Sequence, residues 1–185
     1  MPFSRELWIE REDFMEVPPK GFHRLYPGNM VRLRYGFVVK CTGCEKDAAG
    51  TVTTVFAEYM PDSRSGTPGA DTYQVKGNLH WVSVAHAYEA EVRIYDRLFA
   101  HPHPGQRREG DAPELERDFL TDINPDSRRS LTAYLEPILK DARPEDHFQF
   151  ERHGYFVADR IDSKPGSPAF NRTVTLKDSW AKASK

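Results

Sequence analysis

The stretch Met30-Val-Arg-Leu-Arg-Tyr-Gly-Phe-Val-Val-Lys-Cys41 decides the fold class. Its odd-numbered positions from 31 to 39 are apolar, whereas Arg32, Arg34 and Lys40 at even positions are charged. Successive side chains of a β-strand point to opposite faces, so this alternation predicts one half-buried strand. Arg32 and Arg34 are two residues apart and would lie together on its outer face.

Other short segments of β-strand composition follow this stretch. Thr51–Met60 comes after a turn-forming segment and is predicted to form a hairpin with the first strand. Further strands are expected at Val75–Ser83, Glu91–Phe99, Ser130–Leu135, Phe148–Val157 and Phe170–Lys177. Ala112–Phe119 and the tail from Asp178 are compatible with short helices. About eight short strands and no long amphipathic helix predict an all-β barrel or sandwich.

The composition excludes several classes of protein. The 185 residues carry 26 Lys and Arg against 28 Asp and Glu, which excludes a histone-like basic coat but not a local basic patch. No apolar run approaches the roughly 18 residues of a membrane span. The first residues do not have the pattern of a signal peptide. A cytoplasmic protein without a membrane partner is therefore expected.

Motifs for metal binding or catalysis are weak. Cys41-Thr-Gly-Cys44 offers two of the four ligands that a structural zinc needs, so no metal site is predicted, and whether the two thiols bridge stays open. The sequence contains no G-x-S-x-G and no Gly-rich phosphate loop. His80 and His86 are expected to form hydrogen bonds in a packed turn. A binding protein is favoured, and a small hydrolase using one of these histidines is an alternative.

The segment from Lys20 to Lys40 contains no Asp or Glu. It carries the basic residues Lys20, Arg24, Arg32, Arg34 and Lys40 and, between them, the aromatic residues Phe22, Tyr26, Tyr35 and Phe37. A guanidinium can stack on an unpaired RNA base and can also donate a fork of hydrogen bonds to its edge. The pattern favours single-stranded RNA as the ligand, while a merely solvated strand face is the alternative.

A family resemblance sharpens this interpretation. Ordered motifs along the whole chain resemble the C-terminal region of the bacterial glutaminyl-tRNA synthetase family; they include Phe22-His-Arg24-Leu, Val31-Arg-Leu-Arg34, His80-Trp-Val-Ser83, Arg97-Leu-Phe99, Phe148-Gln-Phe-Glu-Arg152 and Phe170-Asn-Arg-Thr-Val174. The resemblance implies two β-barrels with short helices in their connections. Residues 1–20 and 81–185 would form a near barrel, incomplete at its N-terminal side, and residues 21–80 an inserted far barrel.

The resemblance also implies that catalysis belongs to a separate domain of the enzyme. The H-x-G-H and K-M-S-K-type motifs of the family's catalytic domain do not occur in these residues. The chain is therefore expected to be a fragment that does not charge tRNA alone. It is expected to hold no cofactor, because ATP and Mg²⁺ would bind in that catalytic domain.

Six residues match the family positions that contact the anticodon, and these contacts are what the resemblance implies. His23 and Arg24 match the readers of the third base, Arg32 and Arg34 those of the first, or wobble, base, and Gln149 and Arg152 those of the central uridine. The family usually has lysine where His23 stands. A regular strand would put Gln149 and Arg152 on opposite faces, so we expect a bulge or turn between them, helped by Gly154.

The function expected from the resemblance is anticodon recognition within a class I glutamine–tRNA ligase. That enzyme uses ATP to join glutamine to its tRNA through an aminoacyl-adenylate, and the partner expected here is the anticodon stem-loop, bound by a monomer. One alternative is the equivalent region of a eukaryotic or archaeal-type glutamate–tRNA ligase. Another is a stand-alone β-barrel that binds single-stranded nucleic acid or oligosaccharide without anticodon preference.

Overall fold

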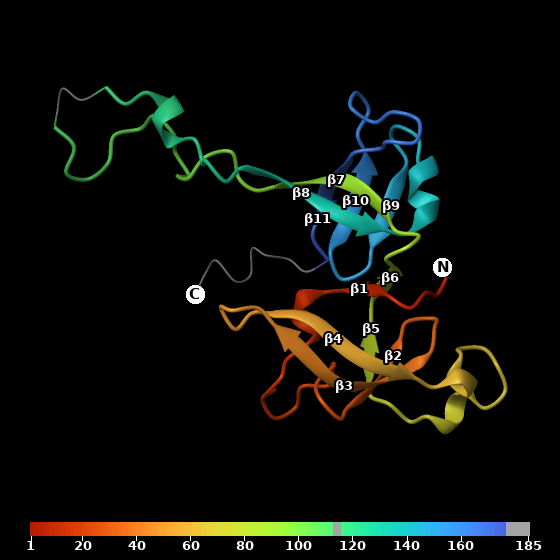
Figure 1. Ribbon diagram of the computed structural model, residues 1–185. Coiled ribbons are helices and arrows are strands. Elements are labelled where there is room, and N and C mark those ends of the chain that lie inside the picture. Colours follow the sequence, from red (N-terminus) through yellow and green to blue (C-terminus); the bar gives the residue numbers. More distant parts are fainter. Residues whose placement is uncertain (113–115, 177–185) are drawn as a thin grey trace. The chain divides into compact units, whose positions relative to one another are not determined.

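The computed structural model describes residues 1–112 and 116–176, which belong to two compact units, Met1–Ala87 and Tyr88–Lys185 (Figure 1). The described residues form β-strands and single 3₁₀ turns, with no α-helix among them. The all-β prediction is confirmed. The sheets of the described residues are open rather than closed into barrels.

The first unit is built on a four-stranded sheet in the order β4-β3-β2-β5. These strands are β2 (Met30–Leu33), β3 (Val38–Lys46), β4 (Val52–Tyr59) and β5 (Gly77–Leu79). The β2–β3 and β3–β4 pairs are antiparallel, whereas β2 and β5 are parallel. The short strand β1 (Leu7–Ile9) pairs separately with β6 (Trp81–Ser83), so the start and the end of this unit meet.

The interpretation of residues 30–41 as one strand is wrong. They form the β2–β3 hairpin, in which Val31 lies opposite Val39, and the chain reverses at residues 34–37, here called the β2–β3 turn. The amide of Leu33 donates to the carbonyl of Phe37 at 2.8 Å and closes the turn. The alternation hides this reversal because odd-numbered residues on both sides of the turn face one core.

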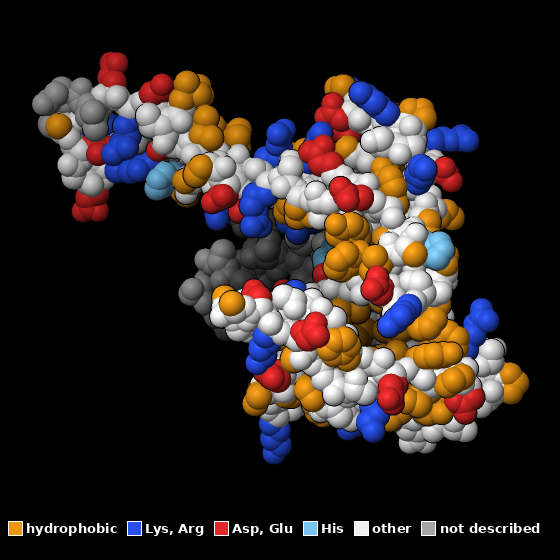
Figure 2. Space-filling model, viewed as in Figure 1, with side chains coloured by type: hydrophobic (Ala, Val, Ile, Leu, Met, Phe, Trp, Pro, Cys, Tyr) orange, Lys and Arg blue, Asp and Glu red, His pale blue; other side chains and the backbone are white. Residues whose placement is uncertain are grey.

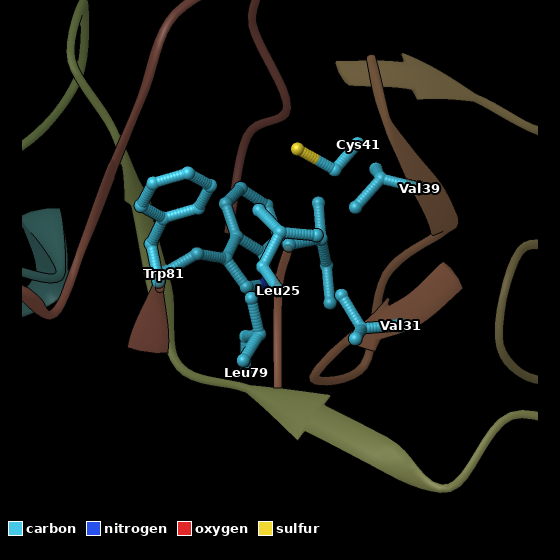
Figure 3. Close-up of a cluster of buried hydrophobic side chains, with 8 residues drawn as sticks. Leu25, Val31, Val39, Cys41, Leu79 and Trp81 are labelled. Atoms are coloured by element: carbon cyan, nitrogen blue, oxygen red, sulfur yellow. The ribbon is translucent and has the colours of Figure 1, made fainter. Parts of the chain in front are cut away.

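That core lies between the hairpin and the strands that end the unit. Val31 and Val39 face Leu79 and Trp81 in a fully packed cluster, which the thiol of Cys41 also joins (Figure 3). Each of these aliphatic side chains contributes about 1.5–3 kcal/mol by leaving water. The hairpin expected between the 30–41 and 51–60 regions is confirmed as β3–β4. The strand expected over Val75–Ser83 is interrupted at His80, which separates β5 from β6.

The second unit contains a five-stranded sheet in the order β8-β7-β11-β10-β9. Its strands are β7 (Tyr88–Tyr95), β8 (Arg128–Leu135), β9 (His147–Phe150), β10 (Gly154–Ala158) and β11 (Phe170–Val174). Phe156 and Phe170 are almost completely buried in its core, and Phe150 stacks on Phe156 with ring centroids 4.3 Å apart. The described residues of the connection between β7 and β8 extend well beyond the sheet (Figure 1).

The remaining elements are 3₁₀ turns in the connections. They are η1 (Arg11–Asp13), η2 (Pro61–Ser63), η3 (Ala70–Thr72), η4 (Phe119–Asp122) and η5 (Pro137–Asp141). Residues 113–115 of the helix expected over Ala112–Phe119 lie outside the described residues, as does the tail from Asp178. The described remainder of the first segment forms no α-helix: residues 116–118 are irregular, and Phe119 begins η4. No helix in the described ranges is long and apolar enough to cross a membrane.

The boundary between the compact units falls between Ala87 and Tyr88. Strand β1, from the first twenty residues, pairs with β6 in the first of them. The assignment of residues 1–20 and 81–185 to one barrel and residues 21–80 to another stays a prediction.

Asp159, just after β10, gives the second unit a defined acid response. Its carboxylate accepts hydrogen bonds from the amides of Asp162 and Ile161 and from the side chain of Asn171, at 2.6–2.8 Å. These bonds favour the charged form and lower the pKa of Asp159 to about 2. Because the folded pKa is below the unfolded one, the carboxylate stabilises the fold above about pH 4, and this stability is lost as the pH falls toward about 2.

We expect this loss to be about 2 kcal/mol. Urea unfolding of the parent and of Asp159→Asn at pH 6 and pH 2.5 measures it. The parent should lose about 2 kcal/mol more than the variant between these two pH values. Parallel losses would show that Asp159 is not responsible.

Candidate nucleic-acid interface

Arg32 is built into the fold of the first unit. It lies on β2, and its two terminal nitrogens donate to the backbone carbonyls of Ser63 at 2.6 Å and Ala70 at 2.8 Å. A guanidinium is suited to this task because its planar fork can hold two acceptors at once. Arg32 therefore fixes residues 61–72, here called the clamp loop, against the sheet.

The clamp loop in turn holds the β2–β3 turn. The hydroxyl of fully buried Ser63 accepts from the amide of Val38 at 2.8 Å and donates to the carbonyl of Met60 at 2.6 Å. Ser65 donates to the carbonyl of Gly36 from both its amide and its hydroxyl, at 2.9 and 3.0 Å. The loop and the turn thus form one hydrogen-bonded structure.

Arg34 lies in the β2–β3 turn, not on the strand with Arg32. Its amide donates to the carbonyl of Leu79 at 2.9 Å, and its carbonyl accepts from the indole N–H of Trp81 at 2.9 Å. Its guanidinium donates to the hydroxyl of Tyr35 at 3.3 Å, and the guanidinium carbon lies 5.1 Å from the centre of that ring. The assignment of Arg32 and Arg34 to the wobble base stays a prediction, but only Arg34 stands at the turn.

His23 and Arg24 lie in the segment that leads into β2. One terminal nitrogen of Arg24 donates to the carboxylate of Asp13 at 2.5 Å, and this carboxylate is fully buried although 38% of the Arg24 side chain is exposed. The side chain of Asn29 holds the Arg24 carbonyl at 2.7 Å. His23 is exposed. Arg24 thus has a structural partner, and its contact with the third base stays a prediction.

Gln149 and Arg152 lie at the β9–β10 hairpin of the second unit. Gln149 is opposite Tyr155 across the hairpin, and residues 151–153 form the turn that follows β9. The turn predicted between them is confirmed, and Arg152 has φ 71° within it. Gly154 helps as expected, because its φ is 135° and a Cβ there would lie 2.3 Å from the carbonyl oxygen of Val174. Whether both side chains reach one base stays a prediction.

The residues suspected of metal binding or hydrolysis have ordinary structural surroundings. Burial raises the pKa of the Cys41 thiol, which keeps it protonated and a poor ligand or nucleophile. No cluster of three or more potential metal ligands occurs among residues 1–112 and 116–176. The Ser83 hydroxyl lies 2.8 Å from Nδ1 of His86, but Ser83 is fully buried, so its oxygen has no access to a substrate.

Tyr35, one of the four aromatic residues interleaved with the basic ones of Lys20–Lys40, is not among the six residues that the sequence predicts at the site. The alternating pattern assigns it to the buried face, yet 79% of it is exposed. The available signal is the Gly36 that follows it, since glycine inside a strand-like run marks a bend or a close approach.

In the view of Figure 2, charges of both signs are scattered over the first unit between patches of hydrophobic side chains, without a continuous basic surface. Aromatic stacking is therefore considered beside overall positive charge as a means by which this unit would bind RNA.

Comparison with known proteins identifies the relatives of this chain. Residues 1–60 and 78–159 match two family models described as "tRNA synthetases class I (E and Q), anti-codon binding domain". The chain is 66% identical to the glutamine–tRNA ligase of Ralstonia nicotianae, 65% to that of Cupriavidus metallidurans and 59% to that of Bordetella avium.

Each of these alignments covers 97–98% of the chain and 29–30% of the relative, so the chain spans about 30% of the length of the curated relatives it matches. The two matched family models are consecutive, and the alignments run through both. The chain therefore belongs to the anticodon-binding region of the class I tRNA synthetases for glutamate and glutamine.

Proposed function

We propose that this chain recognises the anticodon of a glutamine tRNA as part of a glutamine–tRNA ligase. The observation that carries the proposal is the match of 98% of the chain, at 66% identity, to a protein named glutamine–tRNA ligase, together with the two anticodon-binding family models. Arg34 lies in the β2–β3 turn of the first unit, and Arg152 lies in the turn of the β9–β10 hairpin of the second. This agrees with the proposal, because loops held by a rigid sheet are common binding elements.

In this proposal the chain acts by holding unstacked anticodon bases apart. Arg34 would donate to the edge of the wobble base from the β2–β3 turn, and the β9–β10 hairpin would present Gln149 and Arg152 to the central uridine. An amide and a guanidinium together supply donors and an acceptor, which complements the mixed edge of uracil. Arg32 acts indirectly in this scheme, by fixing the clamp loop.

The whole enzyme would attach glutamine to the tRNA in the cytoplasm, using ATP with Mg²⁺ bound outside these residues, and would act as a monomer. The matched family models cover glutamate enzymes as well as glutamine enzymes, which keeps a glutamate–tRNA ligase as the second candidate. Charging of purified glutamine and glutamate tRNAs by the full-length parent separates the two. Charging of glutamate tRNA alone would overturn the proposal.

Replacing Arg34 by alanine should weaken binding of the cognate anticodon arm tenfold to a hundredfold, the usual effect of losing a charged hydrogen-bond partner of a base (about 1–3 kcal/mol). It should also relax discrimination among anticodon arms that differ at the wobble base. Filter binding at one fixed salt concentration measures both effects.

Arg64→Ala is the matched control, because Arg64 is an exposed arginine of the clamp loop. It should weaken all wobble variants by the same small factor, as loss of a phosphate contact would. An Arg34→Ala variant that keeps the parent's preference at the wobble base would contradict the assignment.

A further inference from the structure

Tyr35 combines two features that rarely occur together in an aromatic residue. Its φ is 57°, in the left-handed region, where only three non-glycine residues of the described ranges are found. Tyr35 is also 79% exposed, so burial in a core does not compensate for the unfavourable backbone. Strain of this kind persists when the surroundings impose it, and it is concentrated at binding sites.

The surroundings do impose it. Arg34, the residue before Tyr35, is fixed through both of its backbone polar groups. Its amide donates to the Leu79 carbonyl, and its carbonyl accepts from the Trp81 indole. The residue after Tyr35 is fixed by the two bonds from Ser65, whose loop is held by Arg32. The β2–β3 turn therefore presents the Tyr35 ring from a rigid base, and little conformational entropy is lost when a ligand contacts it.

The Arg34 guanidinium supplies the second part of the arrangement. It lies 5.1 Å from the ring centre and donates to the ring hydroxyl, so the aromatic surface and a fork of donors are held together. Aromatic rings bind single-stranded nucleic acid by stacking on the bases, and this stacking tolerates any base because every base has a π-face. Hydrogen bonds from a neighbouring guanidinium then distinguish one base edge from another.

We propose that Tyr35 is the stacking platform for the first anticodon base, and that it holds this base where Arg34 can contact its edge. The inference rests on the proposed function and adds to it a residue outside the six matched positions. Tyr35 supplies affinity that does not depend on which base is bound, whereas Arg34 supplies affinity that does. A loss of the ring should therefore weaken all wobble variants alike, whereas loss of Arg34 should change their ranking.

The test crosses variants of the 185-residue chain with altered anticodon arms. Tyr35→Gly removes the ring and relieves the φ strain, Tyr35→Leu keeps apolar bulk, and Tyr35→Phe keeps the ring. Tyr35→Phe should bind the intact arm within about twofold of the parent, and Tyr35→Leu and Tyr35→Gly should each lose tenfold to a hundredfold. The midpoint of thermal unfolding of Tyr35→Gly should not fall below that of the parent, which excludes unfolding as the cause.

An abasic nucleotide at each anticodon position then locates the contact. With the first base removed, the parent should lose as much affinity as Tyr35→Gly loses on the intact arm, and the two losses should not add. With the third base removed instead, the parent should still bind more tightly than Tyr35→Gly, by the same factor as on the intact arm.

The outcomes separate the inference from the function on which it rests. If the parent binds no anticodon arm, the proposed function fails and the inference fails with it. If the parent binds but Tyr35→Gly binds equally well, or its loss adds to that of the first abasic site, Tyr35 is not the platform and the proposed function stands. Such a result would leave the exposed ring for a protein contact.

Discussion

Replacing Gly77 by alanine is expected to destabilise the first unit by about 3 kcal/mol, at the upper end of the cost of overpacking. Gly77 is buried where β5 pairs with β2, and an added Cβ would lie 2.0 Å from the carbonyl oxygen of His23 and 2.7 Å from Cγ1 of Val31. The first of these atoms belongs to the backbone and cannot rotate away. The segment that carries His23 and Arg24 would have to move, so binding at that segment should weaken as well.

For a unit of this size, about 3 kcal/mol corresponds to a fall of roughly 12–24 °C in the midpoint of thermal unfolding. Circular dichroism or calorimetry of the parent and the variant measures the shift. Gly43→Ala is the control, because Gly43 also lies in a strand but a Cβ added there would have no atom within 4 Å. It should unfold within about 2 °C of the parent. Equal shifts for the two variants would refute the proposed clash.

Replacing Arg24 by methionine should cost about 3 kcal/mol, because the Asp13 carboxylate loses the cation that lies 2.5 Å away while remaining fully buried. The partly exposed position of Arg24 places the expected cost at the lower end of the range for broken buried pairs. Urea unfolding at neutral pH is the measurement. Adding Asp13→Asn to the same chain should recover part of the loss, since the buried negative charge that Arg24 balances is then removed.

Lys46→Met provides the comparison for Arg24→Met. It breaks the ion pair between Lys46 and Glu16, in which both side chains are substantially exposed, and pairs of that kind contribute less than about 1 kcal/mol. If both methionine variants lose the same small amount, Asp13 does not depend on Arg24. A tRNA-binding defect of Arg24→Met can be assigned to a base contact only after this stability loss has been measured.

The sequence predicts strand content well because burial on one face of a sheet leaves a period of two in the chain. It locates the β3–β4 hairpin and the alternating core positions Val31 and Val39, which do meet in the structure. It does not locate the β2–β3 turn, because the hydrophobic alternation continues on both sides of the reversal. A period alone records which face a residue occupies, not the direction of the chain.

The sequence predicts the candidate site only in part. The part that it does not predict has a different physical cause from the missed turn. The arginines were found from charge and family position, but the partners that divide their roles come from distant segments. Ser63 and Ala70 bind Arg32, and Asp13 binds Arg24. No local pattern encodes such pairings. Tyr35 was misplaced by the strand interpretation itself, since the residue that would face inward from a strand faces outward from a turn.

The pairing of β1 with β6 has a consequence for folding during synthesis on the ribosome. Leu7 lies opposite Ser83, so during synthesis β1 has no partner until nearly all of the first unit has been made. At synthesis rates of about 5–20 residues per second, this interval lasts several seconds. The β3–β4 hairpin can close early during that time, whereas β1 remains unpaired, with its edge open to chaperones.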